Sequence, residues 1–340
     1  MARGAKRTTI IDVGKLAGVS AKTVSRVLNG EPHVKEALQE RVRAAAEALN
    51  YHPNAFAQSL VRQRSHLIGL VFENPSASYV VDLQNGVIDR LDGGSYRLVV
   101  VPVQSVQDHA HEVVGLLRSA GLDGVVLAPP ASDHPLILSQ LAAANMRFAR
   151  ISPTRRVEEG PSHLIDDVAA SREIASYVIG LGHRRIGIIK GDPSHPAAEA
   201  RLLGYTQALY AAGLKLELDL IEGGMFTFES GFEAGKRLVA RPDRPTAILA
   251  QNDEMAVGAM TAAREAGLSV PQDLSVVGFD DSAVSRIVWP RLTTVRQPVF
   301  EMAAAATDML IRQLEGETVD GTTMHRHQLL IRDSAAPPGH

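Results

Sequence analysis

The stretch that decides the fold is Thr9–Gly30, with the sequence TIIDVGKLAGVSAKTVSRVLNG. It predicts two short helices joined by a tight turn. Thr9 caps the first helix with Asp12 as its capping-box partner, and Gly18 ends it because glycine adopts a left-handed conformation at little cost. Ser20 caps the second helix. The outer face of that second helix carries Ala21, Lys22, Ser25 and Arg26. A helix that packs one face on a core and exposes a polar, basic face suits the major groove of DNA, which presents acceptor atoms to Lys and Arg.

The surroundings of this hairpin favour DNA binding over the alternative, an ordinary helical hairpin with a solvated face. A third helix is expected over about Lys35 to Leu49 and closes a small core. Residues 1–65 carry 11 Lys and Arg against 5 Asp and Glu, a net charge of +6. The remainder holds 24 basic and 33 acidic residues, a net charge of −9. A small basic unit on a large acidic one predicts that one end binds phosphate.

Composition and motifs argue against several other classes of protein. The 340 residues include no cysteine, which rules out disulfides and thiolate metal sites and fits a reducing cytoplasm. No apolar run approaches the roughly 20 residues of a membrane span, and the N-terminus does not read as a secretory signal. Nucleotide-binding, nucleophile-elbow and metalloprotease motifs are absent. We therefore expect no catalytic residues, no cofactor and no metal. Two histidine pairs without an evident third ligand are expected to be solvated: His109 with His111, and His325 with His327.

From Ser65 onward the pattern changes to apolar strands that alternate with helices. Such a pattern predicts parallel sheets buried on both faces, and these sheets bind ligands at the carboxyl ends of their strands. The expected strands are Leu67–Phe72, Leu98–Val103, Gly124–Ala128, Ile186–Lys190, Thr246–Ala250 and Leu274–Gly278. The expected helices include Tyr79–Leu91, Val168–Leu181, Arg201–Ala212, Glu229–Ala240 and Asp253–Ala266.

Residues 12–30 carry the pattern Asp-Val-x-x-x-Ala-Gly-Val-Ser-x-x-Thr-Val-Ser-Arg-Val-Leu-Asn-Gly. This pattern resembles the headpiece of the LacI/GalR family of bacterial transcription regulators. One departure is Gly14, where alanine is usual, and it should weaken the first helix by about 0.5–1 kcal/mol. The rest of the chain resembles the two-lobed effector domain that this family shares with periplasmic sugar-binding proteins. The blocks that carry this second resemblance are Leu181–Ile186, Asn252–Ala256, Val276–Asp281 and Leu292–Val295.

The resemblance implies a fold and its division into domains. The fold is a small all-α helix-turn-helix headpiece followed by an α/β, two-lobed, periplasmic-binding-protein-like domain with two parallel doubly wound sheets. The implied domains are a headpiece at 1–53, a hinge helix or linker at 54–64, an effector-binding and dimerisation domain at 65–332, and a disordered tail at 333–340. Because the chain crosses between lobes three times in this fold, each lobe is discontinuous. The N-lobe is expected at about 65–163 and 295–318, and the C-lobe at about 164–292 and 322–332.

The resemblance also nominates residues that contact DNA. The predicted base-reading residues are Ala21, Lys22 and Arg26. Polar groups at or beside helix ends match family positions that touch phosphates, although each could be only a helix cap; they are Thr9, Ser20, Thr23, Ser25, Asn29, His33, Tyr51 and Asn54. Leu60 matches the residue that is wedged into the minor groove, where apolar side chains kink a duplex. A plain linker, in which Leu60 packs on the body, is the alternative.

The predicted effector-binding residues follow strands of the two-lobed domain. They are Asn74, Tyr79, Arg150, Ser152, Arg201, Phe226, Asn252 and Asp280. Arg201 can grip hydroxyls or a carboxylate, with a surface salt bridge as its alternative. Core packing is the alternative for Phe226, and a helix cap for Asp280. Arg150 leaves two alternatives open. In the cleft it would favour an anionic ligand such as a sugar acid, and facing the other lobe it would form a structural ion pair.

These features together predict a cytoplasmic, nucleoid-associated, homodimeric transcription regulator, a repressor of genes for carbohydrate uptake or catabolism. Its partners would be a pseudo-palindromic operator and a small sugar or sugar-acid effector between the lobes, without a membrane partner. Two other classes remain as alternatives. A transport-type sugar-binding protein would not need the basic headpiece, and a doubly wound enzyme would need a catalytic constellation.

Overall fold

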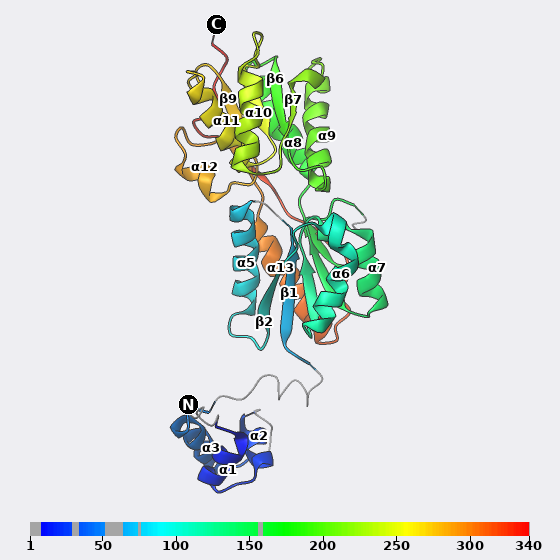
Figure 1. The fold of residues 1–340 in the computed structure, drawn as a ribbon, viewed down its shortest axis with the longest axis vertical. Helices are drawn as coiled ribbons and strands as arrows, with labels where there is room; N and C mark the ends of the chain where they lie inside the picture. The colour runs from blue at the N-terminus through cyan, green and yellow to red at the C-terminus, as the bar shows by residue number, and fades with distance from the viewer. Residues whose placement is uncertain (1–7, 29–33, 52–63, 74–75, 156–158, 340) are drawn as a thin grey trace, which may run out of the picture. The chain divides into compact units, whose positions relative to one another are not determined.

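The computed structural model describes residues 8–28, 34–51, 64–73, 76–155 and 159–339. The chain forms two compact units, Met1–Ser65 and His66–His340. In the first unit, the described residues form α1 (Ile10–Ala17), α2 (Ala21–Leu28) and α3 (Glu36–Ala48), as Figure 1 shows. Among the described residues, no helix is both long and apolar enough to cross a membrane.

The ends of α1 form as the sequence predicts. The Thr9 amide donates to Asp12 Oδ2 over 2.9 Å, and the Asp12 amide donates to Thr9 Oγ1 over 3.4 Å. Gly18 has a φ of 68°, the left-handed conformation expected of it. The three helices enclose a small aliphatic core of Val13, Ala17, Val24, Val27, Val42, Ala45 and Ala46.

Gly14 has a role that the sequence did not reveal. A Cβ atom at this position would lie 2.8 Å from the carbonyl oxygen of Val19 in the turn. The turn therefore packs against α1 more closely than alanine allows without a shift. Glycine at this position therefore lowers the helix propensity of α1 but allows close contact between α1 and the turn.

The second unit begins with a six-stranded sheet in the order β11-β5-β4-β3-β1-β2, in which all neighbours are parallel. Its strands are β1 (Leu67–Phe72), β2 (Arg97–Pro102), β3 (Gly124–Leu127), β4 (Arg147–Ile151), β5 (Ser162–Leu164) and β11 (Thr322–Met324). Helices α5 (Ala77–Leu91) and α13 (Val299–Leu314) cover one face, and α6 (Val106–Ser119) and α7 (Pro135–Ala143) the other (Figure 1). Successive residues Leu70 and Val71 point to opposite cores, as in a strand buried on both faces.

A four-stranded parallel sheet, in the order β7-β6-β8-β9, forms the second lobe. Its strands are β6 (Ile186–Lys190), β7 (Ile221–Gly223), β8 (Ala247–Ala250) and β9 (Ser275–Val277). Helices α8 (Asp167–Gly180) and α9 (Pro196–Ala211) cover one face, α10 (Phe228–Val239) and α11 (Asp253–Glu265) cover the other, and a short α12 (Ala283–Ile287) follows β9.

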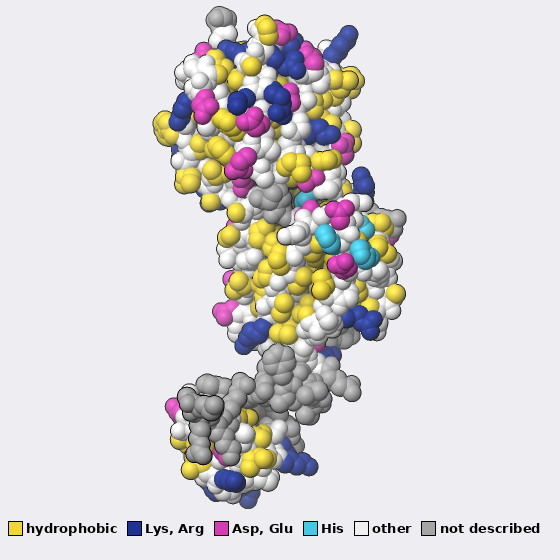
Figure 2. All heavy atoms as spheres, viewed as in Figure 1, with side chains coloured by type: hydrophobic (Ala, Val, Ile, Leu, Met, Phe, Trp, Pro, Cys, Tyr) yellow, Lys and Arg dark blue, Asp and Glu magenta, His cyan; other side chains and the backbone are white. Residues whose placement is uncertain are grey.

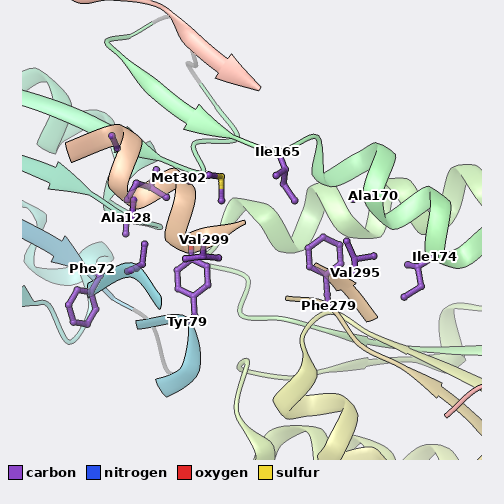
Figure 3. Close-up of a cluster of buried hydrophobic side chains, with 14 of the residues drawn as sticks. Phe72, Tyr79, Ala128, Ile165, Ala170, Ile174, Phe279, Val295, Val299 and Met302 are labelled. Atoms are coloured by element: carbon purple, nitrogen blue, oxygen red, sulfur yellow. The ribbon is translucent and has the colours of Figure 1, made fainter. Parts of the chain in front are cut away.

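The lobes are joined by chain crossings and by a shared core. Strands β10 (Thr294–Arg296) and β12 (Gln328–Leu330) pair antiparallel in a separate two-stranded sheet. Figure 3 shows an apolar cluster that runs from Tyr79 and Val299 to Phe279 and Ile174. This cluster contains residues of both lobes, so a change in the angle between them must repack it.

The expected position of residues 322–332 in the C-lobe is wrong at its start. Strand β11 pairs in parallel with β5 at the edge of the first sheet, and the hydroxyls of Thr322 and Ser162 lie 3.0 Å apart. This pairing satisfies backbone groups of β5 that would otherwise form an open sheet edge.

The expected disorder of residues 333–340 is wrong for 333–339. Ser334 is fully buried, and its hydroxyl donates to the Val276 carbonyl over 2.6 Å. The carbonyl of Ala336 accepts from Ser275 Oγ at 3.0 Å and lies 2.9 Å from His183 Nε2. The segment is ordered because its backbone groups find partners on the second lobe.

Candidate functional site

The candidate DNA-reading surface is the outer face of α2. Ser20 Oγ accepts a hydrogen bond from the Thr23 amide over 3.2 Å and so caps the helix as predicted. Lys22 is exposed. The other nominated positions on this helix, Ala21, Thr23, Ser25 and Arg26, are half-buried. Lys and Arg side chains stand out on the surface of this unit in Figure 2.

A hydrogen bond that the sequence did not predict fixes the end of α1, just before the turn. Arg41 on α3 donates from Nη2 to the carbonyl of Ala17 over 2.6 Å, which satisfies an oxygen at the end of α1. Tyr51 packs against the headpiece core, and its amide donates to Ala46 O over 2.8 Å. These contacts hold the angle between α1 and α3, and α2 packs on the core they form.

Several nominated residues lie outside the described part of the chain. They are Asn29, His33, Asn54, Leu60 and Asn74.

The candidate effector site lies where strands of the two-lobed domain end, and Arg201 on α9 is its central cation. Its Nε donates to Asp167 Oδ1 over 2.8 Å, and its Nη1 donates to the Gln251 carbonyl over 2.5 Å. Its guanidinium carbon lies 3.7 Å from the centroid of the Phe279 ring. The side chain is buried, so the surface salt bridge considered for it is excluded.

Asp280, directly after Phe279, faces this guanidinium. Its Oδ1 lies 3.6 Å from Arg201 Nη1 and accepts from Gln297 Nε2 over 2.6 Å. Burial raises the pKa of Asp280; the charge of Arg201 opposes this, and the nearby Asp253 and Glu254 add to it. A carboxylate in this setting gains from a ligand hydroxyl that donates to it.

Asn252 and Phe226 support each other rather than standing free in the cleft. Asn252 Oδ1 accepts from the Met255 amide over 3.0 Å and caps α11, and its Nδ2 donates to the Phe226 carbonyl over 2.9 Å. The Phe226 ring lies against the backbone of Gly191, where a Cβ atom would come within 1.9 Å of it. Both residues thus position the loops of the second lobe.

Backbone conformation marks the same strand ends. Ser152, Phe226 and Asp280 have φ angles of 47°, 59° and 117°, a region that residues other than glycine rarely occupy. Such strain persists where the surrounding structure enforces it, and it gathers at ligand sites. The buried Ser152 side chain lies against the phenol of Tyr79. Tyr79 of the first lobe is buried, which raises the pKa of its phenol.

The structure places Arg150 inside the first lobe, in neither of the two surroundings considered for it. Its side chain is 0% exposed. Its Nε donates to the Ser132 carbonyl over 2.6 Å, its Nη1 to the Glu159 carbonyl over 3.2 Å, and its Nη2 lies 3.4 Å from Asp133 Oδ1. The guanidinium holds loops of the first lobe together, because its donors meet acceptors inside that lobe. The prediction that Arg150 binds the effector is corrected accordingly.

The structure adds neighbours that sequence patterns did not single out. Asp167, Gln251 and Gln297 contact Arg201 or Asp280. Gln251 immediately precedes the nominated Asn252, and this adjacency is the feature of the sequence that could have indicated it. One group of three metal-ligating side chains also comes together among the described residues: Glu73, Asp192 and His195. No metal site was expected from the sequence.

The helix-turn-helix unit and the two-lobed domain with a polar site at its strand ends define a class, the ligand-responsive DNA-binding regulators. Residues 9–54 match the model of the lacI family of bacterial regulatory proteins, and residues 175–335 match the periplasmic binding protein-like domain. The chain belongs to the lacI family. The resemblance and the fold class predicted from the sequence are confirmed, and the protein is a transcription regulator rather than an enzyme.

Individual relatives cover nearly the whole chain. It is 34% identical over 331 residues to the probable HTH-type transcriptional repressor ExuR of Bacillus subtilis (strain 168), covering 96% of this chain and 98% of ExuR. It is 32% identical over 330 residues to catabolite control protein A of Priestia megaterium, with coverage of 96% and 98%. Its fold matches the lac repressor dimer bound to operator and the anti-inducer ONPF with a TM-score of 0.86, at 30% identity and coverage of 97% and 100%. It matches a CelR–cellobiose complex with a TM-score of 0.73, at 31% identity and coverage of 97% and 100%.

Proposed function

We propose that the protein is a homodimeric repressor that binds a pseudo-palindromic operator. Its affinity for the operator decreases or increases when a small sugar binds between its lobes. The observation that carries the proposal is the buried pair of Arg201 and Asp280 at the strand ends of the two-lobed domain, in a chain whose helix-turn-helix unit matches the family model. The regulated genes would serve carbohydrate uptake or catabolism. The protein would act on chromosomal DNA in the bacterial cytoplasm and nucleoid.

The charges around the site support a neutral sugar over a sugar acid. Arg201 faces two carboxylates, Asp167 and Asp280, and so has little net charge to offer an anion. Arg150, the other arginine considered for the cleft, is bound inside the first lobe. Paired carboxylate and guanidinium groups suit ligand hydroxyls, which both donate and accept hydrogen bonds.

The lobes supply the allosteric change in this proposal. A ligand that binds two lobe arrangements unequally shifts their populations by its difference in affinity. The shared cluster of Figure 3 must repack during such a shift, which favours two discrete arrangements. Exposed apolar side chains on the second lobe, Ile287 at 80% and Trp289 at 72%, support a homodimer.

Some parts of the proposal rest on family resemblance alone. They are the phosphate contacts of Asn29, His33 and Asn54, the minor-groove wedge of Leu60, the cleft role of Asn74, and the domain limits 1–53, 54–64 and 65–332. Leu60→Ala should reduce affinity for the operator more than affinity for random DNA. An equal loss of affinity for operator and for random DNA would contradict insertion of Leu60 into the minor groove.

A salt series with the full chain tests the proposal against its alternatives. Affinity for random duplex DNA should fall steeply as a straight line in log K against log salt, because counterions are released when Lys and Arg bind phosphates. A transport-type sugar-binding protein or an enzyme would show almost no slope. Thermal-shift screening of neutral sugars and sugar acids then identifies the effector class.

A further inference from the structure

Three side chains with metal-binding atoms meet where the two lobes face each other. Glu73 follows β1 of the first lobe, whereas Asp192 and His195 lie in the loop between β6 and α9 of the second lobe. One ligand atom from each residue lies within 4.8 Å of the other two. A point at the centre of such a triangle is at most roughly 2.8 Å from each atom, near the 2.0–2.6 Å of metal–ligand bonds.

Backbone amides hold both carboxylates in place. The Val106 amide donates to Glu73 Oε2, and the Ser194 amide donates to Asp192 Oδ1 over 2.8 Å. Within the described part of the chain, the other oxygen of each carboxylate accepts no hydrogen bond. Outer partners of this kind orient metal ligands before the ion binds.

His195 supplies an independent sign that something is bound here. Its side chain is only 3% exposed, and its buried Nε2 has no hydrogen-bond partner among the described residues. The edge of the ring packs on Phe226, with 5.5 Å between centroids. An unpaired buried nitrogen is costly, and a metal ion would satisfy it.

The negative charges of the Glu73 and Asp192 carboxylates also favour a bound cation. Among the ion pairs of the described residues, none includes Glu73 or Asp192. Two carboxylates and a neutral imidazole form a donor set typical of Zn²⁺ and related transition metals, whereas Mg²⁺ and Ca²⁺ prefer oxygen alone.

We propose that Glu73, Asp192 and His195 bind a divalent transition-metal ion that bridges the two lobes. The ligands come from both lobes, so only an arrangement that keeps the lobes as near to each other as they are here, called closed, offers all three. An ion that binds one arrangement stabilises it by mass action. The metal is thus a second effector of lobe closure, and its binding depends on no sugar.

Calorimetric titration of the full chain, stripped of metal by a chelator, tests the site with Zn²⁺ as probe. We expect one tight Zn²⁺ site per chain. Glu73→Gln and His195→Ala should each weaken it about 10–100-fold, while their circular dichroism stays that of the wild type. The matched control is His111→Gln with Glu112→Gln, an exposed pair 3.4 Å apart on α6, which should leave this site unchanged. Unchanged zinc binding in the first two variants, or an equal loss in the control, would overturn the proposal. Equally tight Mg²⁺ binding would overturn the choice of metal.

The bridging role has its own measurement. The chain has no cysteine, so Ser119→Cys in the first lobe and Glu265→Cys in the second place two spin labels without background. In labelled chains diluted with unlabelled protein, Zn²⁺ should shorten the distance between labels, and adding Asp192→Asn should abolish the change. Zinc that binds tightly without altering this distance would refute a bridge between lobes. This readout needs neither operator nor sugar, so its failure is distinct from failure of the proposed repressor function.

Discussion

The guanidinium of Arg201 lies over the ring of Phe279, 3.7 Å from its centroid. A desolvated cation–π contact of this kind contributes about 2 kcal/mol. It fixes the plane of the guanidinium so that one edge meets Asp167 and the other approaches Asp280. The site is therefore organised before any ligand arrives, which lowers the entropy cost of binding.

The first prediction concerns Asp280→Asn. The amide keeps the shape of the side chain but loses the charge that faces Arg201. Because a hydrogen bond to a charged group contributes about 1.5–3 kcal/mol, the affinity for the effector should weaken about tenfold or more. Operator affinity without effector should stay near that of the wild type. Anisotropy of labelled operator, titrated with effector, measures both. The control is Asp308→Asn, which breaks an exposed pair with Arg90. An unchanged effector titration would remove Asp280 from the site.

The second prediction concerns Lys22→Ala on the exposed face of α2. If Lys22 reads a base, discrimination between the selected operator and random DNA should fall by about 1–3 kcal/mol. Lys15→Ala, an exposed lysine in the last turn of α1, is the matched control. Competition binding with both DNAs measures the difference. A parallel loss on operator and random DNA would instead make Lys22 a phosphate contact.

The third prediction separates a structural Arg150 from a ligand-binding one. Arg150→Met leaves three carbonyls, those of Ser132, Arg155 and Glu159, without their buried donor and removes the positive charge beside Asp133, so it should lower the free energy of unfolding by about 3–5 kcal/mol. Arg147→Met, exposed on the same strand β4, should have little effect. Chemical unfolding followed by circular dichroism compares them. An Arg150→Met variant that has normal stability but no longer responds to the effector would instead show that Arg150 binds the effector.

The fourth prediction concerns the C-terminal segment. Ser334 Oγ accepts from the Thr293 amide over 2.9 Å and donates to the Val276 carbonyl. Ser334→Ala leaves both groups unpaired in a buried place, which should cost about 1–3 kcal/mol. Ser139→Ala, whose hydroxyl bonds to Leu136 at the surface of α7, is the control. Urea unfolding followed through Trp289, the single tryptophan, reports the second lobe. Equal stability of the two variants would contradict the buried role of Ser334.

The fifth prediction is a pH dependence. Burial raises the pKa of Asp253 to about 7, whereas the unfolded chain has the ordinary value near 3.9. Between these values the folded state binds more protons, so the free energy of unfolding should decrease as pH rises from about 4 to 7, by at most about 1.4 kcal/mol per unit. Asp253→Asn should flatten this decrease, and Asp308→Asn should not. Parallel pH profiles for wild type and Asp253→Asn would exclude this titration.

Local interactions made much of the fold predictable from the sequence. Thr9, Asp12 and Gly18 act within a few residues of one another, so their caps formed as expected. The six predicted strands are five or six residues long and mostly apolar, and they lie in sheets covered on both faces. All of them exist, with ends that match the prediction or shift by one residue. Strands β5, β7, β10, β11 and β12 have three residues each, too few to show a period, and they were not predicted.

By itself the sequence determined the class of protein, with its basic helix-turn-helix unit and parallel α/β lobes, and it nominated Arg201 and Asp280 for the effector site through a family pattern. Only the tertiary structure decided where a side chain points. Arg150 on β4 and Arg201 on α9 are both buried, yet one donates to loop carbonyls inside the first lobe and the other to the carboxylate of Asp167. Glu73 and His195 meet although 122 positions of the printed sequence separate them. Partners of this kind are set by how distant loops fold together, and no spacing along the chain encodes that distance.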